Sequence, residues 1–203
     1  MTYIKLNLAQ LFNVSYMGQS KFDDDFKHFS RICDEYIFYF VKEGDLYIEE
    51  DGKAYHLTEG DYLILEPNKH HIGYKGAPVH YYFIHIKDAD FSVVNGYSEA
   101  HIQEDIAKRR LTTLSSDMTT STFKEDSVAL IPKTYHLDQN FELYQLLDTA
   151  CHELNQKNEN YKLSAVLLSM QVLIKMNRLF NAQAAKGISQ KAYATVKEVI
   201  HYL

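Results

Sequence analysis

Histidines and carboxylates are the side chains with which this chain could do chemistry. The sequence contains ten histidines, and Glu35 and His71 both fall in one segment of short apolar runs, with His28 as a third candidate ligand. A closed metal site in a protein takes about four such ligands. Because two or three candidates are too few, we predict neither a bound metal nor any other cofactor.

The sequence shows no arrangement of catalytic residues. Cys33 has no basic neighbour and no second cysteine close by that would activate its thiol. The chain also lacks a serine in a Gly-x-Ser-x-Gly turn, a glycine-rich phosphate loop and a closely spaced carboxylate pair with an obvious apolar pocket. We therefore predict no catalytic residues and a protein that is not an enzyme.

Aromatic residues are the more prominent feature, with 16 Tyr and 11 Phe but no Trp. Between Glu35 and Val41 both alternating faces of the expected strand are apolar or aromatic, so both should be covered. An interior lined by Tyr, His and Arg suits a small polar ligand, because rings stack on a sugar while polar groups bond its oxygens. Aromatic packing in an ordinary core is the alternative.

A series of short strands in residues 34–71 must position these side chains. Gly44, Gly52 and Gly60 separate the strands at intervals of eight residues. Asp51 before Gly52 favours a two-residue hairpin, because such a turn needs positive φ angles. Short, evenly spaced strands rich in Tyr, Phe, Ile and Val predict a small antiparallel barrel or sandwich.

Further elements are expected on the C-terminal side of this segment. Residues 80–86 and 127–137 read as strands, and residues 98–111 as a short helix that Ser98 caps. From Asp138 onward the apolar spacing changes to that of a helix.

A second long helix, in about residues 160–181, carries residues at alternating steps of three and four. Such a seam packs either within the chain or against a second copy of it, where a buried Asn can fix the register. The seam consists of Leu163, Val166, Met170, Leu173, Asn177 and Phe180.

Charge and composition limit the partners. The formal net charge is −6, and residues 1–137 carry 14 Lys and Arg against 21 Asp and Glu, which would repel a phosphate backbone. Two cysteines and the absence of a basic-then-apolar leader predict a cytoplasmic protein with reduced thiols. The longest apolar stretch falls short of the ~20 residues of a membrane span.

The order of these features resembles the N-terminal, cupin-like effector-binding and dimerisation domain of AraC-type transcriptional regulators. The segments that carry the resemblance are Arg31, EYIFYFVKEGDLYIEEDGKAYHLTEGDYLILEPNKHH, HYYFIHI and two helices, with the motifs Gly52-Lys53-x-Tyr55, Gly60-Asp61-x-Leu63 and Pro67 followed by His71.

The resemblance implies an α+β fold. A cupin-like antiparallel β-barrel, also called a double-stranded β-helix or jelly roll, would be followed by a pair of antiparallel helices and a truncated linker helix. The implied domains are an effector-binding barrel in residues 1–137 and a helical dimerisation region in residues 138–186. Residues 187–203 would be a linker and the start of a missing helix-turn-helix DNA-binding module.

The resemblance also implies a function. A small-molecule effector, in many relatives a sugar, would bind in the barrel of a homodimer, and DNA would be a partner only through the missing module. The implied ligand contacts are Arg31, Glu35, Tyr39, His71, Tyr81 and Phe83. The alternative is a cupin-type metal-dependent enzyme acting on a small polar substrate. Against it, metal-binding cupins use more histidines than this sequence retains around Glu35.

Overall fold

The computed structural model describes residues 1–112, 120, 127–137 and 140–184. Residues 187–203, predicted to contain a linker and the start of a further helix, lie outside the described part. The chain forms two compact units, which we call the barrel unit, Gln10–Asp90 with Lys133–Lys175, and the second unit, Met1–Ala9 with Phe91–Pro132 and the chain from Met176 on. The boundaries of these two units differ from those of the three predicted domains. The division into three domains stays a prediction.

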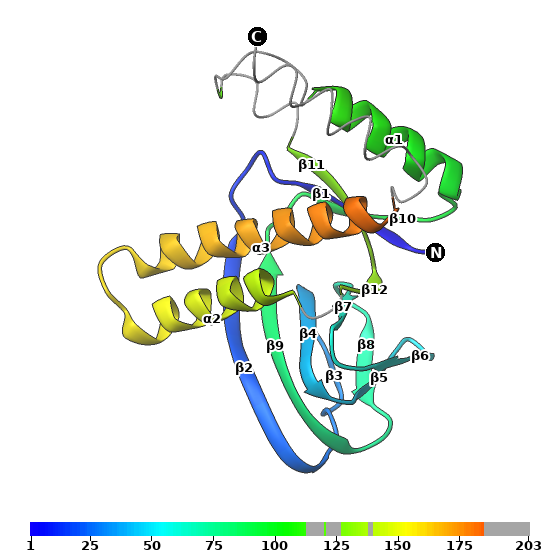
Figure 1. Cartoon of the computed structure of the whole chain (residues 1–203). Coiled ribbons are helices and arrows are strands. Elements are labelled where there is room, and N and C mark those ends of the chain that lie inside the picture. Colours follow the sequence, from blue (N-terminus) through cyan, green and yellow to red (C-terminus); the bar gives the residue numbers. More distant parts are fainter. Residues whose placement is uncertain (113–119, 121–126, 138–139, 185–203) are drawn as a thin grey trace. The chain divides into compact units, whose positions relative to one another are not determined.

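Two antiparallel sheets make up most of the barrel unit (Figure 1). The five-stranded sheet has the order β12-β7-β4-β9-β2, and the four-stranded sheet has the order β3-β8-β5-β6. The strands of the first sheet are β2 (Asn13–Phe26), β4 (Tyr36–Gly44), β7 (Asp61–Leu65), β9 (Ala77–Lys87) and β12 (Thr134–His136). Those of the second are β3 (Arg31–Ile32), β5 (Leu46–Glu50), β6 (Lys53–Leu57) and β8 (His70–Gly73).

The core of the barrel unit lies between these two sheets. Ile37, Tyr39 and Val41 of β4 belong to one buried cluster together with Leu46 and Ile48 of β5. Since alternate residues of a strand point to opposite faces, this cluster defines the inner face of the barrel. The expected α+β fold with a cupin-like antiparallel barrel is thereby confirmed.

The predicted hairpin at Asp51 and Gly52 is also confirmed. Their φ angles are 45° and 80°, and Glu50 pairs with Lys53 across the turn. Positive φ at both central residues matches the right-handed twist of the flanking strands, which explains why Asp and Gly occupy these positions.

Two helices follow the last strand of the barrel unit, α2 (Phe141–Gln156) and α3 (Tyr161–Ala184). Asn140 caps α2 by accepting a hydrogen bond from the Leu143 backbone N–H, and Lys157 ends it in the left-handed conformation. The Tyr144 hydroxyl donates to the Val41 carbonyl at 2.7 Å. Helix α2 therefore covers the outer face of the five-stranded sheet, as the two apolar faces of β4 predicted.

The second unit contains a three-stranded antiparallel sheet with the order β10-β1-β11. Its elements are β1 (Tyr3–Asn7), β10 (Phe91–Val94), α1 (Glu99–Thr112) and β11 (Val128–Pro132). Ser98 caps α1, since its Oγ accepts a hydrogen bond from the His101 N–H at 3.3 Å. Ile102 and Ile106 are buried, and their spacing of four residues places them on one face of α1.

The prediction of a single strand over residues 127–137 is wrong. Strand β11 ends at Pro132 and pairs with β1, whereas β12 begins at Thr134 and pairs with β7. Between them lies Lys133, whose side chain is buried in ion pairs with Glu50 and Glu66. The change of partner sheet depends on these distant contacts, which a local apolar pattern does not contain.

Among the described helices, α3 has the length and the apolar composition that would allow it to cross a membrane. A core helix of a folded domain meets the same criterion. Ala165, Ser169, Val172 and Leu173 of α3 are fully buried within the chain, and the Ser169 hydroxyl lies 3.9 Å from the Met17 sulfur of β2. One face of α3 therefore packs in the core, and the absence of a membrane partner stays a prediction.

Candidate functional site

The inner face of the barrel unit carries a group of polar side chains, which we call the interior cluster. It consists of His28, Arg31, Glu35, Tyr39, His71 and His85. Arg31 of β3 stands opposite His71 of β8 in the four-stranded sheet, and Tyr39 of β4 stands opposite Phe83 of β9 in the five-stranded sheet. The two sheets thus bring these side chains together from opposite walls of the barrel.

Arg31 connects the members of this cluster. Its Nε donates to His71 Nε2 at 3.0 Å, and its Nη2 lies 3.4 Å from the Tyr39 hydroxyl and 3.3 Å from His85 Nε2. The guanidinium carbon also lies 4.9 Å from the centre of the Phe29 ring. A single cation therefore donates hydrogen bonds to one hydroxyl and two imidazoles and also contacts an aromatic face.

The hydrogen bonds define one consistent set of histidine tautomers. His28 Nδ1 lies 2.8 Å from the Phe29 carbonyl and His85 Nδ1 lies 2.8 Å from Glu35 Oε2, so both Nδ1 atoms are donors. Their Nε2 atoms then accept, His28 from the Tyr39 hydroxyl at 2.8 Å and His85 from Arg31. His71 Nε2 likewise accepts from Arg31. All three imidazoles are neutral in this network.

Burial keeps these histidines neutral. Desolvation lowers the pKa of His28 to about 4, with Arg31 and His85 acting in the same direction. It also lowers the pKa of His71 to about 4, aided by His28 and Arg31. The pKa of His85 is lowered by desolvation, although its hydrogen bond to Glu35 opposes this change. The interior cluster therefore holds uncharged imidazoles around one positive charge.

Glu35 adds a negative charge at the edge of the cluster. Burial would raise the pKa of its carboxyl group, but hydrogen bonds from Ser15 and His85 outweigh burial and hold the pKa below its usual value. The carboxylate accepts from His85 rather than from Arg31. Its effect on Arg31 is thus indirect, because it fixes the tautomer that leaves His85 Nε2 as an acceptor.

Aromatic rings surround the polar groups. The Tyr81 ring lies 5.4 Å from Tyr39 in an edge-on arrangement and 6.2 Å from Phe83. Tyr16 of β2 lies 5.0 Å from Phe83 and is largely exposed. These rings form a partly accessible apolar surface next to the interior cluster, which suits a ligand with both polar and apolar faces.

A glycine fixes the position of His28. The Gly73 N–H of β8 donates to the His28 carbonyl at 2.9 Å, and a Cβ placed on Gly73 would lie 2.4 Å from the His28 backbone nitrogen. No side chain fits in that space without moving the backbone. Gly73 therefore permits the segment before β3 to approach β8 closely enough for His28 to reach Tyr39.

The structure brings together the six residues predicted as ligand contacts. Arg31 contacts Tyr39 and His71 directly, and Glu35 joins them through His85. Tyr81 and Phe83 lie on the same inner face. Their role in ligand binding stays a prediction.

The predicted contacts omitted two members of the cluster, His28 and His85. His85 follows Tyr81 and Phe83 at steps of two along β9, so strict alternation would have placed it on the same face. His28 precedes β3 in a segment without regular structure, and its sequence had suggested only a possible metal ligand. Nothing local indicates its contact with Tyr39.

The donor set of the cluster does not fit a divalent metal. Among the residues that the structure describes, no three His, Cys, Asp or Glu side chains form a group that could hold a metal ion. Arg31 already donates to two of the three imidazole Nε2 atoms, and its positive charge would repel a metal cation. The arrangement suits an anion or a polar neutral ligand better than a cation.

We predict an acid-sensitive stability from His28 and His71. Their pKa values in the folded state lie below those in the unfolded state, so their full contribution is present above about pH 6.5 and is lost toward about pH 4. Between about pH 7 and pH 5 each should cost about 1 to 2 kcal/mol. Urea unfolding at both pH values measures this loss.

The matched comparison uses two variants. His71→Gln should lose less stability than the wild type on acidification, and His152→Gln, at an exposed position of α2, is the control. An equal loss in wild type and His71→Gln would contradict the prediction.

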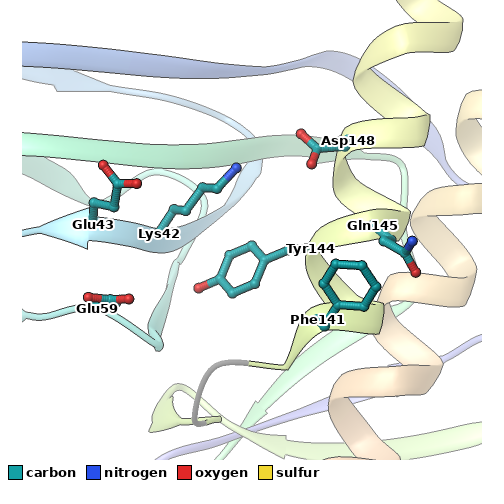
Figure 2. A pocket seen from close by; sticks show the side chains of 7 residues that line it. All are labelled: Lys42, Glu43, Glu59, Phe141, Tyr144, Gln145 and Asp148. Atoms are coloured by element: carbon teal, nitrogen blue, oxygen red, sulfur yellow. The ribbon is translucent and has the colours of Figure 1, made fainter.

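A separate hollow of about 290 Å³ lies on the outer side of the five-stranded sheet. Figure 2 shows Lys42 and Glu43 of β4 facing Tyr144 and Asp148 of α2 across it. The Lys42 ammonium donates to the Tyr82 hydroxyl at 2.9 Å, which in turn donates to Asp148 at 2.6 Å. These polar groups satisfy one another and attach α2 to the sheet, so we place the candidate site in the interior cluster instead.

The predicted helix seam on α3 is divided by the structure. Leu173 and Phe180 are 0% and 4% exposed, so these two residues pack within the chain, the alternative that the spacing had left open. The role of the seam in a dimer stays a prediction. Leu163 is 49% exposed, whereas Val166, Met170 and Asn177 are half-buried. Leu167, outside the predicted seam, is 45% exposed. Two adjacent apolar stripes run along α3, and spacing alone does not distinguish the buried one.

Comparisons with known proteins agree with a ligand-binding barrel. Residues 14–91 match the family model described as AraC-like ligand binding domain. The uncharacterized HTH-type transcriptional regulator YisR of Bacillus subtilis (strain 168) is 27% identical over 92 residues, or 43% of this chain. The match spans 32% of that relative, about a third of its length.

Solved cupin structures also align with the chain. The cupin domain of Cnp3 from Schizosaccharomyces pombe aligns with a TM-score of 0.33 and 9% identity, over 38% of this chain and 64% of that one. An RmlC-like cupin from Shewanella frigidimarina aligns with a TM-score of 0.31 and 18% identity, over 36% of this chain and 66% of that one.

Proposed function

We propose that the chain senses a small-molecule effector and controls an attached DNA-binding module, a proposal supported by the match of residues 14–91 to the AraC-like ligand binding domain. The interior cluster would bind the effector. The observation that carries this proposal is the meeting of Arg31, Tyr39 and three neutral histidines inside the barrel, beside a partly exposed aromatic surface. A sugar or a sugar-like compound fits this combination of polar and apolar groups.

Regulation would follow from differential binding. An effector can shift the protein only between states for which it has different affinities. Arg31 and His71 come from the four-stranded sheet, whereas Tyr39 and His85 come from the five-stranded sheet, so a ligand among them would couple the two walls of the barrel. The similarity to an HTH-type transcriptional regulator of Bacillus subtilis supports a regulatory role with DNA as the final partner. We place the protein in the cytoplasm, where such a regulator meets DNA, and assign it no enzymatic activity.

A thermal-shift screen over small metabolites tests the proposal. A compound that binds the folded state must raise its stability, by about 2.7 kcal/mol at a concentration a hundred times its Kd. The stabilisation should be lost in His71→Ala and retained in His152→Ala, whose side chain is exposed on α2. If sugars, sugar acids and other polar metabolites all leave the unfolding temperature unchanged, the proposal fails.

The exposed stripe of α3 would form a homodimer interface. Leu163 and Leu167 are about half exposed, and the half-buried Met170 and Ile174 continue the line at steps of three and four. Phe141 at the start of α2 adds a ring that is 73% exposed. Apolar side chains of this size gathered on a helix pair favour association with a second copy.

We predict that Leu167→Asp makes the protein monomeric without unfolding it, because the carboxylate stays in water in the monomer but would be buried at the interface. Sedimentation velocity measures the mass, and circular dichroism checks the fold. Ser92→Asp, at an exposed position of β10, provides the control for an added charge. A dimer of unchanged stability in Leu167→Asp would place the interface elsewhere.

A further inference from the structure

The charge of Arg31 is not matched by a carboxylate. Its hydrogen-bond acceptors are the Tyr39 hydroxyl and the neutral Nε2 atoms of His71 and His85. Among the described residues no ion pair joins Arg31 to Asp or Glu, and Glu35 is engaged by His85. A partly buried guanidinium without a counter-ion is unfavourable, because burial removes water that would otherwise solvate the charge.

Part of the guanidinium remains available for a ligand. Nε and Nη2 make the three hydrogen bonds, whereas Nη1 makes none with the described residues. A guanidinium offers five N–H donors in a planar fork, and two of them belong to Nη1. Nη1 can therefore donate to one oxygen of a carboxylate. The second oxygen would accept from Nη2 in the parallel arrangement of a guanidinium–carboxylate pair, if Nη2 gives up one of its longer bonds, 3.4 Å to Tyr39 or 3.3 Å to His85.

The surroundings of Arg31 limit the ligand to one negative charge. Arg31 is the cation of the interior cluster, because His28, His71 and His85 are neutral. The Glu35 carboxylate lies on the far side of His85, 2.8 Å from its Nδ1, where it would repel a second negative charge. A dianion such as a phosphate monoester is therefore disfavoured.

The remaining groups favour hydroxyls on the same ligand. The Tyr39 hydroxyl and the neutral imidazoles can each exchange their present hydrogen bonds for bonds to a hydroxyl group. Tyr16 and Phe83 supply a ring surface against which an apolar face can stack. We propose that the effector is a hydroxyl-bearing monocarboxylate of the sugar-acid type, with its carboxylate bound by Arg31. The inference rests on the proposed function, since it names the ligand class of the same site.

Isothermal titration of the full chain with D-galacturonate and D-gluconate tests this inference, with D-galactose and D-glucose as their neutral counterparts and inorganic phosphate as the dianion. At least one acid should bind, and its neutral counterpart should bind about 10- to 100-fold more weakly, because a charge-assisted pair is lost. Arg31→Gln should weaken the acid by the same factor, and Arg31→Lys by less. Lys53→Gln, which removes an exposed cation from β6, should leave binding unchanged.

The possible failures can be told apart. If a neutral sugar binds at least as well as its acid, and Arg31→Gln leaves its affinity unchanged, the sugar-acid inference is overturned while the proposed function stands. Preferential binding of phosphate would overturn it in favour of a dianion. If no acid binds, the inference is overturned, and if no metabolite of any class binds, the proposed function fails with it.

Discussion

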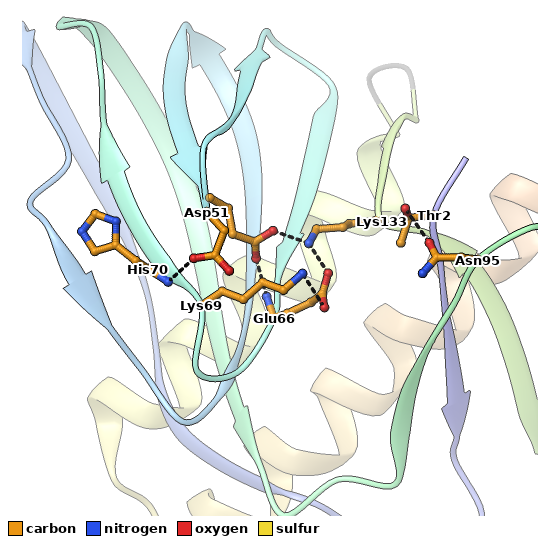
Figure 3. Close-up of polar contacts among 8 residues, drawn as sticks. Thr2, Asp51, Glu66, Lys69, His70, Asn95 and Lys133 are labelled. Atoms are coloured by element: carbon orange, nitrogen blue, oxygen red, sulfur yellow. Dashed lines mark hydrogen bonds and ion pairs between the residues drawn. The ribbon is translucent and has the colours of Figure 1, made fainter.

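Replacing Lys133 with Ala should lower the free energy of unfolding by about 3–5 kcal/mol, because it leaves buried carboxylates without their cation. Lys133 is 4% exposed and its ammonium contacts both Glu50 and Glu66. Figure 3 shows Lys133 and Lys69 on either side of Glu66, which Lys69 reaches at 2.9 Å. Glu50 also accepts from the Glu66 backbone N–H at 2.7 Å, so one network joins β5, the end of β7 and the start of β12.

This network also has a pH dependence. Burial would raise the pKa of Glu66, but the hydrogen bonds from Lys133 and Lys69 outweigh it and hold the pKa below its usual value. The stabilisation is therefore present above the pKa of an unfolded glutamate and is lost as the pH falls through the folded value.

Urea unfolding followed by circular dichroism measures the loss. Lys133→Met keeps the aliphatic volume of the side chain and should be destabilised nearly as much as Lys133→Ala, since the missing charge rather than the missing volume is the cause. Lys87→Ala is the matched control, because Lys87 pairs with Asp34 at 2.6 Å on the surface, where water screens the pair, and its loss should cost far less than that of Lys133. An equal cost at Lys133 and Lys87 would show that the buried network contributes little.

Leu173→Asp should cost about 4 kcal/mol or more, enough to unfold a large fraction of the molecules. Leu173 is 0% exposed in the single chain, so the substitution removes apolar packing and places a carboxylate where no water reaches it. Leu167→Asp, on the exposed stripe of the same helix, introduces the same group at a position that is 45% exposed. The two variants differ in burial and not in chemistry.

The measurement is the urea midpoint of both variants, combined with their mass in sedimentation. We expect the free energy of unfolding of Leu167→Asp to lie within about 1 kcal/mol of that of the wild-type monomer. Leu173→Asp should lose its cooperative unfolding transition. If Leu173→Asp instead gives a stable, folded monomer, Leu173 belongs to an interface between copies and not to the core.

The barrel was the more predictable part of the fold. The glycine spacing, the Asp51-Gly52 turn and the two apolar faces of β4 are local features, and each acts through backbone conformation or alternation. The break at Lys133 and the choice between the two stripes of α3 were not predictable in this way. Both depend on partners far along the chain, namely Glu50 and the packing of α3 in the core.

The site was predictable where residues lie on regular strands. Tyr39, Tyr81 and Phe83 share the inner face through alternation, and His85 extends the same row by one step. His28 was not assigned to the site, because it precedes β3 in an irregular segment whose path depends on the close approach at Gly73. The hydrogen bonds of Arg31 likewise arise only when the two sheets face each other.

The most direct test of the account is an imidazole ¹⁵N NMR titration of the chain with the compound that raises its unfolding temperature most, the histidines being assigned by single His→Gln variants. We predict that the Nε2 signals of His28, His71 and His85 shift on binding, because a ligand in the interior cluster must replace or alter their hydrogen bonds. The signals of exposed His136 and His152 should stay in place. Shifts confined to the exposed histidines, with those of the interior cluster unmoved, would contradict an effector site inside the barrel.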